Sequence, residues 1–399
     1  MMLNRLKPQA EKIIAEEQAG FRAGRSTTEQ IFNLRILCER RDCETSLLWN
    51  QQLKISEMSS IDYSHTPLFE QDKEPMIDEG VFNVLNIVIY VVALGIICLF
   101  GIIFNAINIY VFFKQGFKDT VNITPFSLAV SDMGNVVTLL WMSVCFNPLF
   151  AQSILPVVYH DLAYITSGWP HTIFARISSL ITAFVTFERC LCIALPLKVK
   201  TIITPRRTIY VIVSIYIGLA VCAAPAFYSV SLGPKHDSEV NMTMLGVVYI
   251  PNGVFIEGIS LYISAFSQVV SFFSVIVCTV ILVQNLLIKS RWRKSSSSTA
   301  KQESVSNRDM KVVKMVVSIA GIFIVGFSPS VANIFTMLAI PDFNYYGEYH
   351  HIYVIVWGIS FLLVTTNSAV NIFVYYYMSS KFKEILDDTL KKVRGKCCV

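Results

Sequence analysis

Residues 82–113 read FNVLNIVIYVVALGIICLFGIIFNAINIYVFF, a long run without a single charged side chain. About 20 apolar residues are enough for a helix to cross the hydrocarbon core of a bilayer. Backbone N–H and C=O groups find no water there, so a segment that crosses alone must satisfy them within itself, as a helix does. The run therefore predicts a membrane-spanning helix.

Six further apolar runs follow the first one. The seven predicted spans are 82–113, 121–147, 162–196, 208–230, 257–288, 311–339 and 351–378. The composition agrees, because only 15% of the 399 residues are charged while 54% are hydrophobic. We therefore predict an all-α membrane protein, a seven-helix bundle. A transporter is an alternative, but we find no internal repeat or pair of broken helices of the kind that transporters show.

The charges between the spans indicate the orientation. Lys and Arg gather in the first, third and fifth connecting segments and after the last span, whereas the other connections hold only Lys235. Positive charge stays on the cytosolic side of a membrane. We therefore expect a multi-pass protein of the plasma membrane with its amino terminus outside. The sequon at Asn241 should then be glycosylated, and the one at Asn122 should be cytosolic and unmodified.

The rest of the chain divides into three parts around the predicted bundle at 82–378. Residues 46–81 form an extracellular segment, and residues 379–399 form a membrane-parallel helix and a cytosolic tail. Residues 6–40, LKPQAEKIIAEEQAGFRAGRSTTEQIFNLRILCER, resemble a stretch of LINE-type reverse transcriptase. We find no aspartate pair of the kind that this enzyme uses to bind metal. We interpret residues 1–45 as a disordered retroelement fragment, and we expect no nucleic-acid partner.

Six short motifs lie in six different segments of the chain. They are Asn105, LAVSD at 128–132, ERC at 188–190, FSP at 327–329, Asn371 with Tyr375, and Phe382. In this order they resemble the motifs of the rhodopsin-like (class A) family of G-protein-coupled receptors, and the resemblance covers residues 82–399. It implies a receptor without enzymatic activity. Such a receptor binds an extracellular small-molecule or peptide ligand and activates a heterotrimeric G protein.

Three positions depart from the pattern of that family. Ile372 stands where the family has a proline, Phe327 where it has a tryptophan, and Tyr164 where the third helix carries a disulfide-forming cysteine. Residues 231–256 contain no cysteine, so the usual partner of that disulfide is missing too. The resemblance therefore implies the switching machinery but not the outer disulfide.

Several longer stretches resemble a narrower group, the molluscan chemosensory-receptor expansions. They are QGFKDTVNIT at 115–124, GWPH at 168–171, ERCLCIALPLKVKTIITPRRT at 188–208 and NSAVNIFVYYYMSSKF at 367–382. The resemblance implies a chemosensory ligand. An invertebrate neuropeptide receptor is the alternative, and the sequence identifies neither the ligand nor the G-protein subtype.

Asp132 places a carboxylate in the middle of the second predicted helix, where an acid is expensive and usually functional. The oxygen-bearing residues that match the same depth in the family are Ser178, Asn367, Ser368 and Asn371. The resemblance implies that this set holds an allosteric sodium ion, and oxygen ligands around one carboxylate suit a hard cation. A polar core held by hydrogen bonds alone is the alternative. No other cofactor is expected.

A conformational switch is implied at the cytosolic side. Glu188 and Arg189 end the third helix, and Asp309 begins the sixth. The resemblance implies that Arg189 pairs with the acid at rest and frees the sixth helix on release. Pro329 removes one helical hydrogen bond and would supply the bend for that movement. The alternatives are a surface Asp309 with no partner and a proline that moves nothing.

We expect the ligand pocket between the outer halves of the helices. His171 stands where amine receptors carry an aspartate, so a small cationic amine is not expected. Arg176, about one turn deeper, is either a counter-ion for an anionic ligand or a cation neutralised within the bundle. The other lining candidates, for which simple packing is the alternative, are Glu257, Tyr262, Phe327, Asn333 and Trp357.

Cys397 and Cys398 follow a basic amphipathic stretch at the end of the chain. A basic helix lies well on the anionic inner leaflet, and cysteines beside it are typical sites of palmitoylation. We therefore expect membrane lipid as a partner of the tail. A pair of free cytosolic thiols is the alternative.

Overall fold

The structure of the chain is a computed structural model, and it describes residues 76–151, 157–194, 202–237, 242–295, 300–345 and 347–397. The chain separates into two compact units, Met1–Lys73 and Glu74–Val399, and all described residues belong to the second. The predicted retroelement fragment at 1–45 lies outside the described residues. So does the 46–81 segment up to residue 75.

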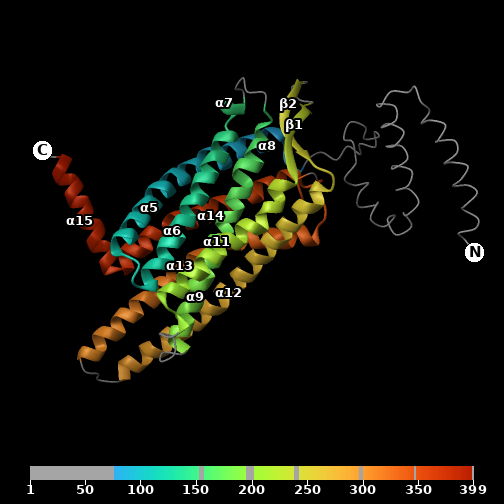
Figure 1. Cartoon of the computed structure of the whole chain (residues 1–399). Coiled ribbons are helices and arrows are strands. Elements are labelled where there is room, and N and C mark those ends of the chain that lie inside the picture. Colours follow the sequence, from blue (N-terminus) through green and yellow to red (C-terminus); the bar gives the residue numbers. More distant parts are fainter. Residues whose placement is uncertain are drawn as a thin grey trace, which may run out of the picture. The chain divides into compact units, whose positions relative to one another are not determined.

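Within the described residues, seven long helices pack into one bundle (Figure 1). In chain order they are α4 (Glu79–Asn86) continued by η2 (Ile87–Ala93) and α5 (Leu94–Gln115); α6 (Thr120–Cys145); α8 (Tyr159–Ala163) continued by η3 (Tyr164–Gly168) and α9 (Trp169–Ala194); α11 (Pro205–Tyr228); α12 (Gly253–Ser295); α13 (Ala300–Ala339); and α14 (His350–Met378). The short helix α7 (Pro148–Ala151) follows the second of them. The predicted seven-helix bundle is confirmed.

Six of these helices are long and apolar enough to cross a membrane by themselves, as judged on the described residues, and α9 is not among them. It carries Arg176, Glu188 and Arg189 along its length. It also contacts α6, α11, α12 and α13, so other helices shield much of its surface from lipid. An interior helix can therefore be more polar than the helices around it.

Local signals set the ends of several helices. Asp78 accepts a hydrogen bond from the backbone of Val81 at the start of α4, and Thr204 does the same for Arg207 at the start of α11, with Pro205 at the first position. Helix α5 ends at Gly116, which has a positive φ of 78°. Helices α12 and α13 continue beyond the apolar runs at 257–288 and 311–339.

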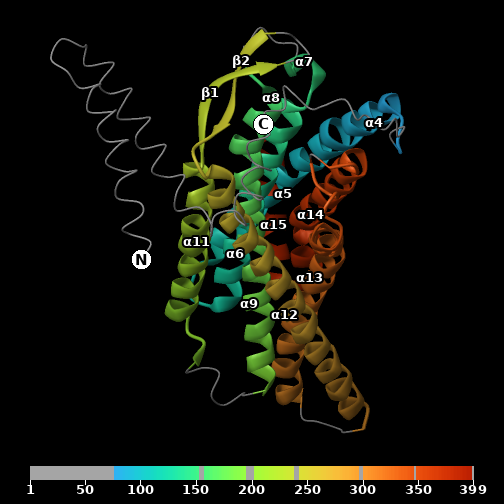
Figure 2. The ribbon, with the colours of Figure 1, turned by 90° about the vertical axis from the view of Figure 1, so that its right-hand side faces the viewer.

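A β-hairpin, which the sequence did not lead us to predict, follows α11. Strands β1 (Val230–Asp237) and β2 (Met242–Tyr249) pair antiparallel, with Val230 opposite Tyr249. Val157 adds one parallel bridge to Leu245. Figure 2 shows the hairpin over one end of the bundle, here called the hairpin end. The opposite end, where α14 leads into α15 (Ser380–Cys397), is called the α15 end.

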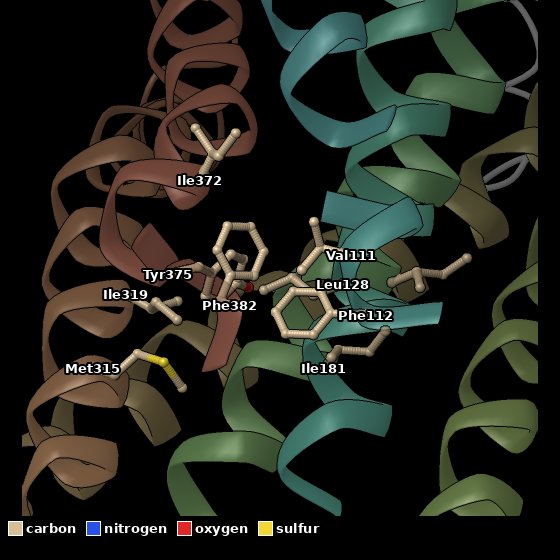
Figure 3. Close-up of a cluster of buried hydrophobic side chains, with 10 residues drawn as sticks. Val111, Phe112, Leu128, Ile181, Met315, Ile319, Ile372, Tyr375 and Phe382 are labelled. Atoms are coloured by element: carbon tan, nitrogen blue, oxygen red, sulfur yellow. The ribbon is translucent and has the colours of Figure 1, made fainter. Parts of the chain in front are cut away.

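The buried side chains at the α15 end form one cluster, drawn in Figure 3. Phe112 of α5 meets Tyr375 of α14 edge-on, with 4.9 Å between ring centroids, and lies 5.3 Å from Phe382 of α15. Phe382 is fully buried. Burial of this aromatic ring anchors α15 to the bundle and explains why the helix begins there.

Candidate functional site

Asp132 is fully buried near the middle of α6, and its carboxylate joins three helices. Oδ1 accepts hydrogen bonds from the hydroxyls of Ser178 in α9 (2.9 Å) and Ser368 in α14 (3.0 Å). Oδ2 accepts one from Nδ2 of Asn371 in α14 (2.9 Å). An acid taken out of water is costly unless such bonds replace its hydration. The site therefore depends on α6, α9 and α14 keeping this arrangement.

The polar network extends from Asp132 toward the hairpin end. The hydroxyl of Ser368 also accepts from Nδ2 of Asn135 (3.1 Å), and Oδ1 of Asn135 lies 2.6 Å from Nδ1 of His171. The ring of His171 is buried and meets Phe361 edge-on at 4.9 Å. His171, predicted to contact ligand, thus lies at the hairpin-ward end of the Asp132 network.

The oxygen atoms around Asp132 suit a sodium ion. Asp132, Ser178 and Ser368 bring a carboxylate and two hydroxyls together. Oδ1 of Asn371 is buried and has no hydrogen-bond partner among the described residues, so it offers one more oxygen. Asn367 is buried in α14 but makes no hydrogen bond to Asp132 within the same residues. The structure thus brings together four of the five predicted residues, a set of the oxygen type that hard cations prefer.

A small cavity lies between α6, α9, α13 and α14 toward the α15 end. Its volume of about 20 Å³ has room for a single water molecule. Arg189 and Tyr375 line it together with Met315 and Ile319 of α13. An Nη atom of Arg189 is 3.5 Å from Oε1 of Glu188, and both Glu188 oxygens are buried without a hydrogen bond among the described residues. Arg189 of this pair therefore borders the cavity.

Pro329 lies inside α13 without ending the helix. It has no N–H to donate to the carbonyl of Val325, four residues earlier. The hydroxyl of Ser328 donates to that carbonyl instead (3.1 Å), so the freed acceptor is satisfied. The helix thus still lacks one backbone hydrogen bond at Pro329, although a side chain satisfies the freed carbonyl.

Glu257, at the start of α12, is the centre of a second buried network, here called the Glu257 clamp. Its Oε1 accepts from the hydroxyl of Tyr164 in η3 (2.5 Å) and from Nε1 of Trp169 in α9 (3.0 Å). Its Oε2 accepts from the hydroxyl of Tyr249 at the end of β2 (2.7 Å). Three donors already occupy this carboxylate, so Glu257 holds the hairpin to the bundle. Its place in the ligand pocket stays a prediction.

Asp161 makes a second connection between the third helix and the hairpin. Its Oδ2 accepts from the ammonium of Lys235 in β1 (2.9 Å) and from the backbone N–H of Val247 in β2 (3.0 Å). With the Glu257 clamp, this bond fixes both strands over the bundle end. Tyr164, which stands where the family carries a disulfide-forming cysteine, therefore contributes to a noncovalent connection between the third helix and the hairpin.

The other predicted pocket residues divide into buried and exposed positions. Tyr262 is 73% exposed on the outside of α12, so it faces away from the bundle interior and we withdraw it as a pocket residue. Asn333 donates to the hydroxyl of Ser360 (3.0 Å), and the ring of Phe327 lies 4.5 Å from that of Phe323. Nε1 of Trp357 is buried without a hydrogen bond among the described residues.

Some predicted sites lie where the structure gives no side-chain description. These are the carboxylate of Asp309, the sequon at Asn241, and the thiols of Cys397 and Cys398. The backbone of α13 includes Asp309, and that of α15 includes Cys397.

Comparison with known proteins agrees with this geometry. The family model described as "7 transmembrane receptor (rhodopsin family)" matches residues 104–375, more than half of the chain. The chain therefore belongs to the rhodopsin family of seven-transmembrane receptors. It is a multi-pass receptor of the plasma membrane, not an enzyme.

Two named receptors illustrate the similarity. The platelet-activating factor receptor of Mus musculus is 23% identical over 320 residues, which cover 77% of this chain and 88% of that receptor. The neurotensin receptor type 2 of Mus musculus is 22% identical over 355 residues, with 77% and 83% covered. Both match almost over their full length, and so support the assignment of the whole bundle.

Proposed function

We propose that the protein binds an extracellular ligand at the hairpin end and activates a heterotrimeric G protein at the α15 end. The observation that carries this proposal is the position of Arg189. It lines a cavity between α6, α9, α13 and α14, at the end of the bundle away from the hairpin. A cavity of about 20 Å³ is far too small for any segment of a protein. The arrangement therefore corresponds to a resting receptor.

Activation requires this cavity to open. Met315 and Ile319 of α13 form one wall, so an outward movement of α13 would expose Arg189 to a partner protein. Pro329 lies on the hairpin side of that wall, where a helix lacking one backbone hydrogen bond bends more easily. Such a movement of one rigid element past another is a common switching design.

The orientation in the membrane follows from the charges that flank the helices. Lys and Arg residues at the α15 end include Lys114, Lys118, Arg206, Arg207 and the basic face of α15. Among the described residues, the lysine at the hairpin end is Lys235, and it pairs with Asp161. By the positive-inside rule, the α15 end faces the cytosol and the hairpin faces outside.

Two ligand classes follow from different observations. The sequences at the helix borders, such as GWPH at 168–171, resemble those of chemosensory receptors and support a chemosensory ligand. The similarity to a neurotensin receptor supports the second candidate, a neuropeptide. A transcript confined to sensory epithelium would favour the first candidate, whereas one in central ganglia would favour the second.

We also propose that Asp132, Ser178, Ser368 and Asn371 hold an allosteric sodium ion in the resting state. The donor set and the unused oxygen of Asn371 support this assignment. A bound cation would neutralise the buried carboxylate and hold α6, α9 and α14 together. Any rearrangement of α14 that separates these oxygens would then release it.

The experiment that tests coupling uses the full chain in insect-cell membranes with purified G-protein heterotrimers of each major class. Ligand-independent binding of a non-hydrolysable GTP analogue is measured for wild type, Arg189→Ala and the matched surface variant Arg206→Ala. We expect exchange above background with at least one heterotrimer for wild type and Arg206→Ala, and none for Arg189→Ala. Equal exchange by all three proteins, or none by well-expressed wild type, would refute the proposal.

A further inference from the structure

Arg176 lies one helical turn deeper than His171, on the side of α9 that faces α12. Its Nε donates to the hydroxyl of Ser264 (3.0 Å), and Nη1 donates to the side-chain oxygen of Gln268. Position 176 is seven residues into α9, about 10 Å along the helix from Trp169. The guanidinium therefore sits well inside the predicted membrane span, between two helices.

Both partners of Arg176 are neutral. Arg189 pairs with Glu188 and Lys235 with Asp161 among the described residues, and Arg176 belongs to neither pair. Asp132 makes its hydrogen bonds to Ser178, Ser368 and Asn371, and Glu257 makes its own to other groups. A guanidinium keeps its charge in a protein, and the described residues offer this cation no salt-bridge partner. The bundle tolerates an expensive charge, which marks a functional site by default.

Two hydrogen-bond donors are left unused at this place. Gln268 is fully buried, its oxygen accepts from Arg176, and its Nε2 has no partner among the described residues. Arg176 uses Nε and Nη1, which leaves Nη2 for another acceptor. Buried donors left unpaired are costly, and native proteins rarely keep them without a purpose. A group that accepts several hydrogen bonds and carries negative charge would satisfy both residues.

The site is also next to the residues that would transmit a signal. Ala175, the neighbour of Arg176, packs in one buried cluster with Phe272 of α12 and with Phe323 and Phe327 of α13. Phe327 is two residues before Pro329, where α13 lacks one backbone hydrogen bond. A ligand held at Arg176 would therefore press on the helix that must move.

We propose that Arg176 and Gln268 bind the oxyanion of the ligand, a carboxylate or a phosphate ester. Arg176 pairs with the charge in the forked geometry that guanidinium favours, and Nε2 of Gln268 donates to a second oxygen. We infer that the bound molecule is an agonist, and only this part of the inference rests on the proposed function. The site itself is tested by binding, without any G protein.

The test measures thermal unfolding of the purified full chain in lipid nanodiscs with matched probe pairs. Octanoate is compared with octanamide, N-acetyl-leucine with N-acetyl-leucinamide, and hexyl phosphate with hexanol and inorganic phosphate. We expect at least one organic oxyanion to raise the midpoint by about 3 °C or more at saturation, and its neutral analogue to leave it unchanged. The shift should vanish in Arg176→Gln and in Gln268→Leu, and persist in Arg206→Gln.

A second arm needs no ligand. Gln268→Glu keeps the shape of the side chain and supplies the missing counter-ion, so it should raise the unfolding midpoint of the empty receptor and abolish the oxyanion shift. Arg176→Gln should also be at least as stable as wild type, because it removes an uncompensated charge. If both variants unfold earlier than wild type, or if no oxyanion stabilises more than its neutral analogue, Arg176 is a structural residue and the proposal fails. If only inorganic phosphate stabilises the chain, no organic ligand is recognised and the proposal fails as well.

Discussion

The hydroxyl of Tyr164 donates a 2.5 Å hydrogen bond to Oε1 of Glu257, and so ties the third helix to the start of the fifth. The same carboxylate holds Trp169 and, through Tyr249, the end of the hairpin. Relatives of this family that carry a disulfide at the Tyr164 position would hold the hairpin covalently. In this chain a buried carboxylate with three donors performs that task.

The Glu257 clamp can be tested by removing one hydroxyl. Tyr164→Phe deletes a hydrogen bond to a buried charged acceptor, which contributes about 1.5–3 kcal/mol. We expect a lower unfolding midpoint and faster hydrogen exchange in β1 and β2. Tyr262→Phe in α12 is the matched control, because that tyrosine is exposed. Unchanged exchange in the hairpin of Tyr164→Phe would show that the clamp does not hold it.

The polar core predicts a response to sodium. Wild-type protein in nanodiscs should unfold at a higher temperature in sodium chloride than in choline chloride of the same ionic strength, because a cation that binds only the folded state stabilises it. Asp132→Asn should abolish the difference, since it removes the charged ligand, while potassium chloride serves as the control for ion size. If sodium and choline give the same midpoint for wild type, hydrogen bonds alone maintain the core.

Much of this fold could be predicted because hydropathy fixes the spans. Residues 121–147, for example, differ only slightly from α6 at Thr120–Cys145. The polar core was equally accessible, because Asp132 is expensive in a membrane and the family resemblance places Ser178 and Asn371 at the same depth. Such sites are specified by residue type and position along a helix, which a sequence contains.

Partners across the bundle were harder to predict. The three donors of Glu257 come from η3, α9 and β2, and no spacing within α12 indicates them. Tyr262 was assigned to the pocket because α12 is apolar on its lipid face as well as its inner face, so hydrophobic periodicity does not separate the two. The hairpin was missed because a short two-stranded segment is stabilised mainly by its contacts with the bundle, not by its own sequence.

The orientation predicts the state of two sequons. Asn241 lies in the segment between β1 and β2, on the face proposed to be outside, and should carry a glycan. Asn122 is buried in α6 and donates to the carbonyl of Gly116 (3.0 Å), so it is inaccessible, and the proposed orientation puts it on the cytosolic side. Asn241→Gln should therefore remove the whole glycan-dependent mobility shift of the expressed protein. A shift that persists in Asn241→Gln and disappears in Asn122→Gln would reverse the topology.

A charge pair that holds the receptor in its resting state predicts a gain of activity when that pair is broken. Glu188 is the acid that the described side chains place near Arg189, at 3.5 Å, and this contact is too long for a good hydrogen bond. The guanidinium can therefore accommodate a second acid. Asp309 is in the same helix, α13, as the cavity-lining residues Val312 and Met315. We predict that Asp309 pairs with Arg189 across the gap between α9 and α13.

Loss of that pair should shift the receptor toward its active form. A net contribution of about 1–2 kcal/mol changes the ratio of resting to active states about tenfold. Asp309→Ala should thus raise ligand-independent nucleotide exchange several-fold, whereas Arg189→Ala should stay silent because the arginine is also proposed to contact the G protein. Glu303→Ala, which removes another acid from α13, is the matched control and should keep wild-type exchange. If Asp309→Ala is expressed at the surface and behaves like Glu303→Ala, the resting state is held by the packing of Phe112, Tyr375 and Phe382 rather than by this charge pair.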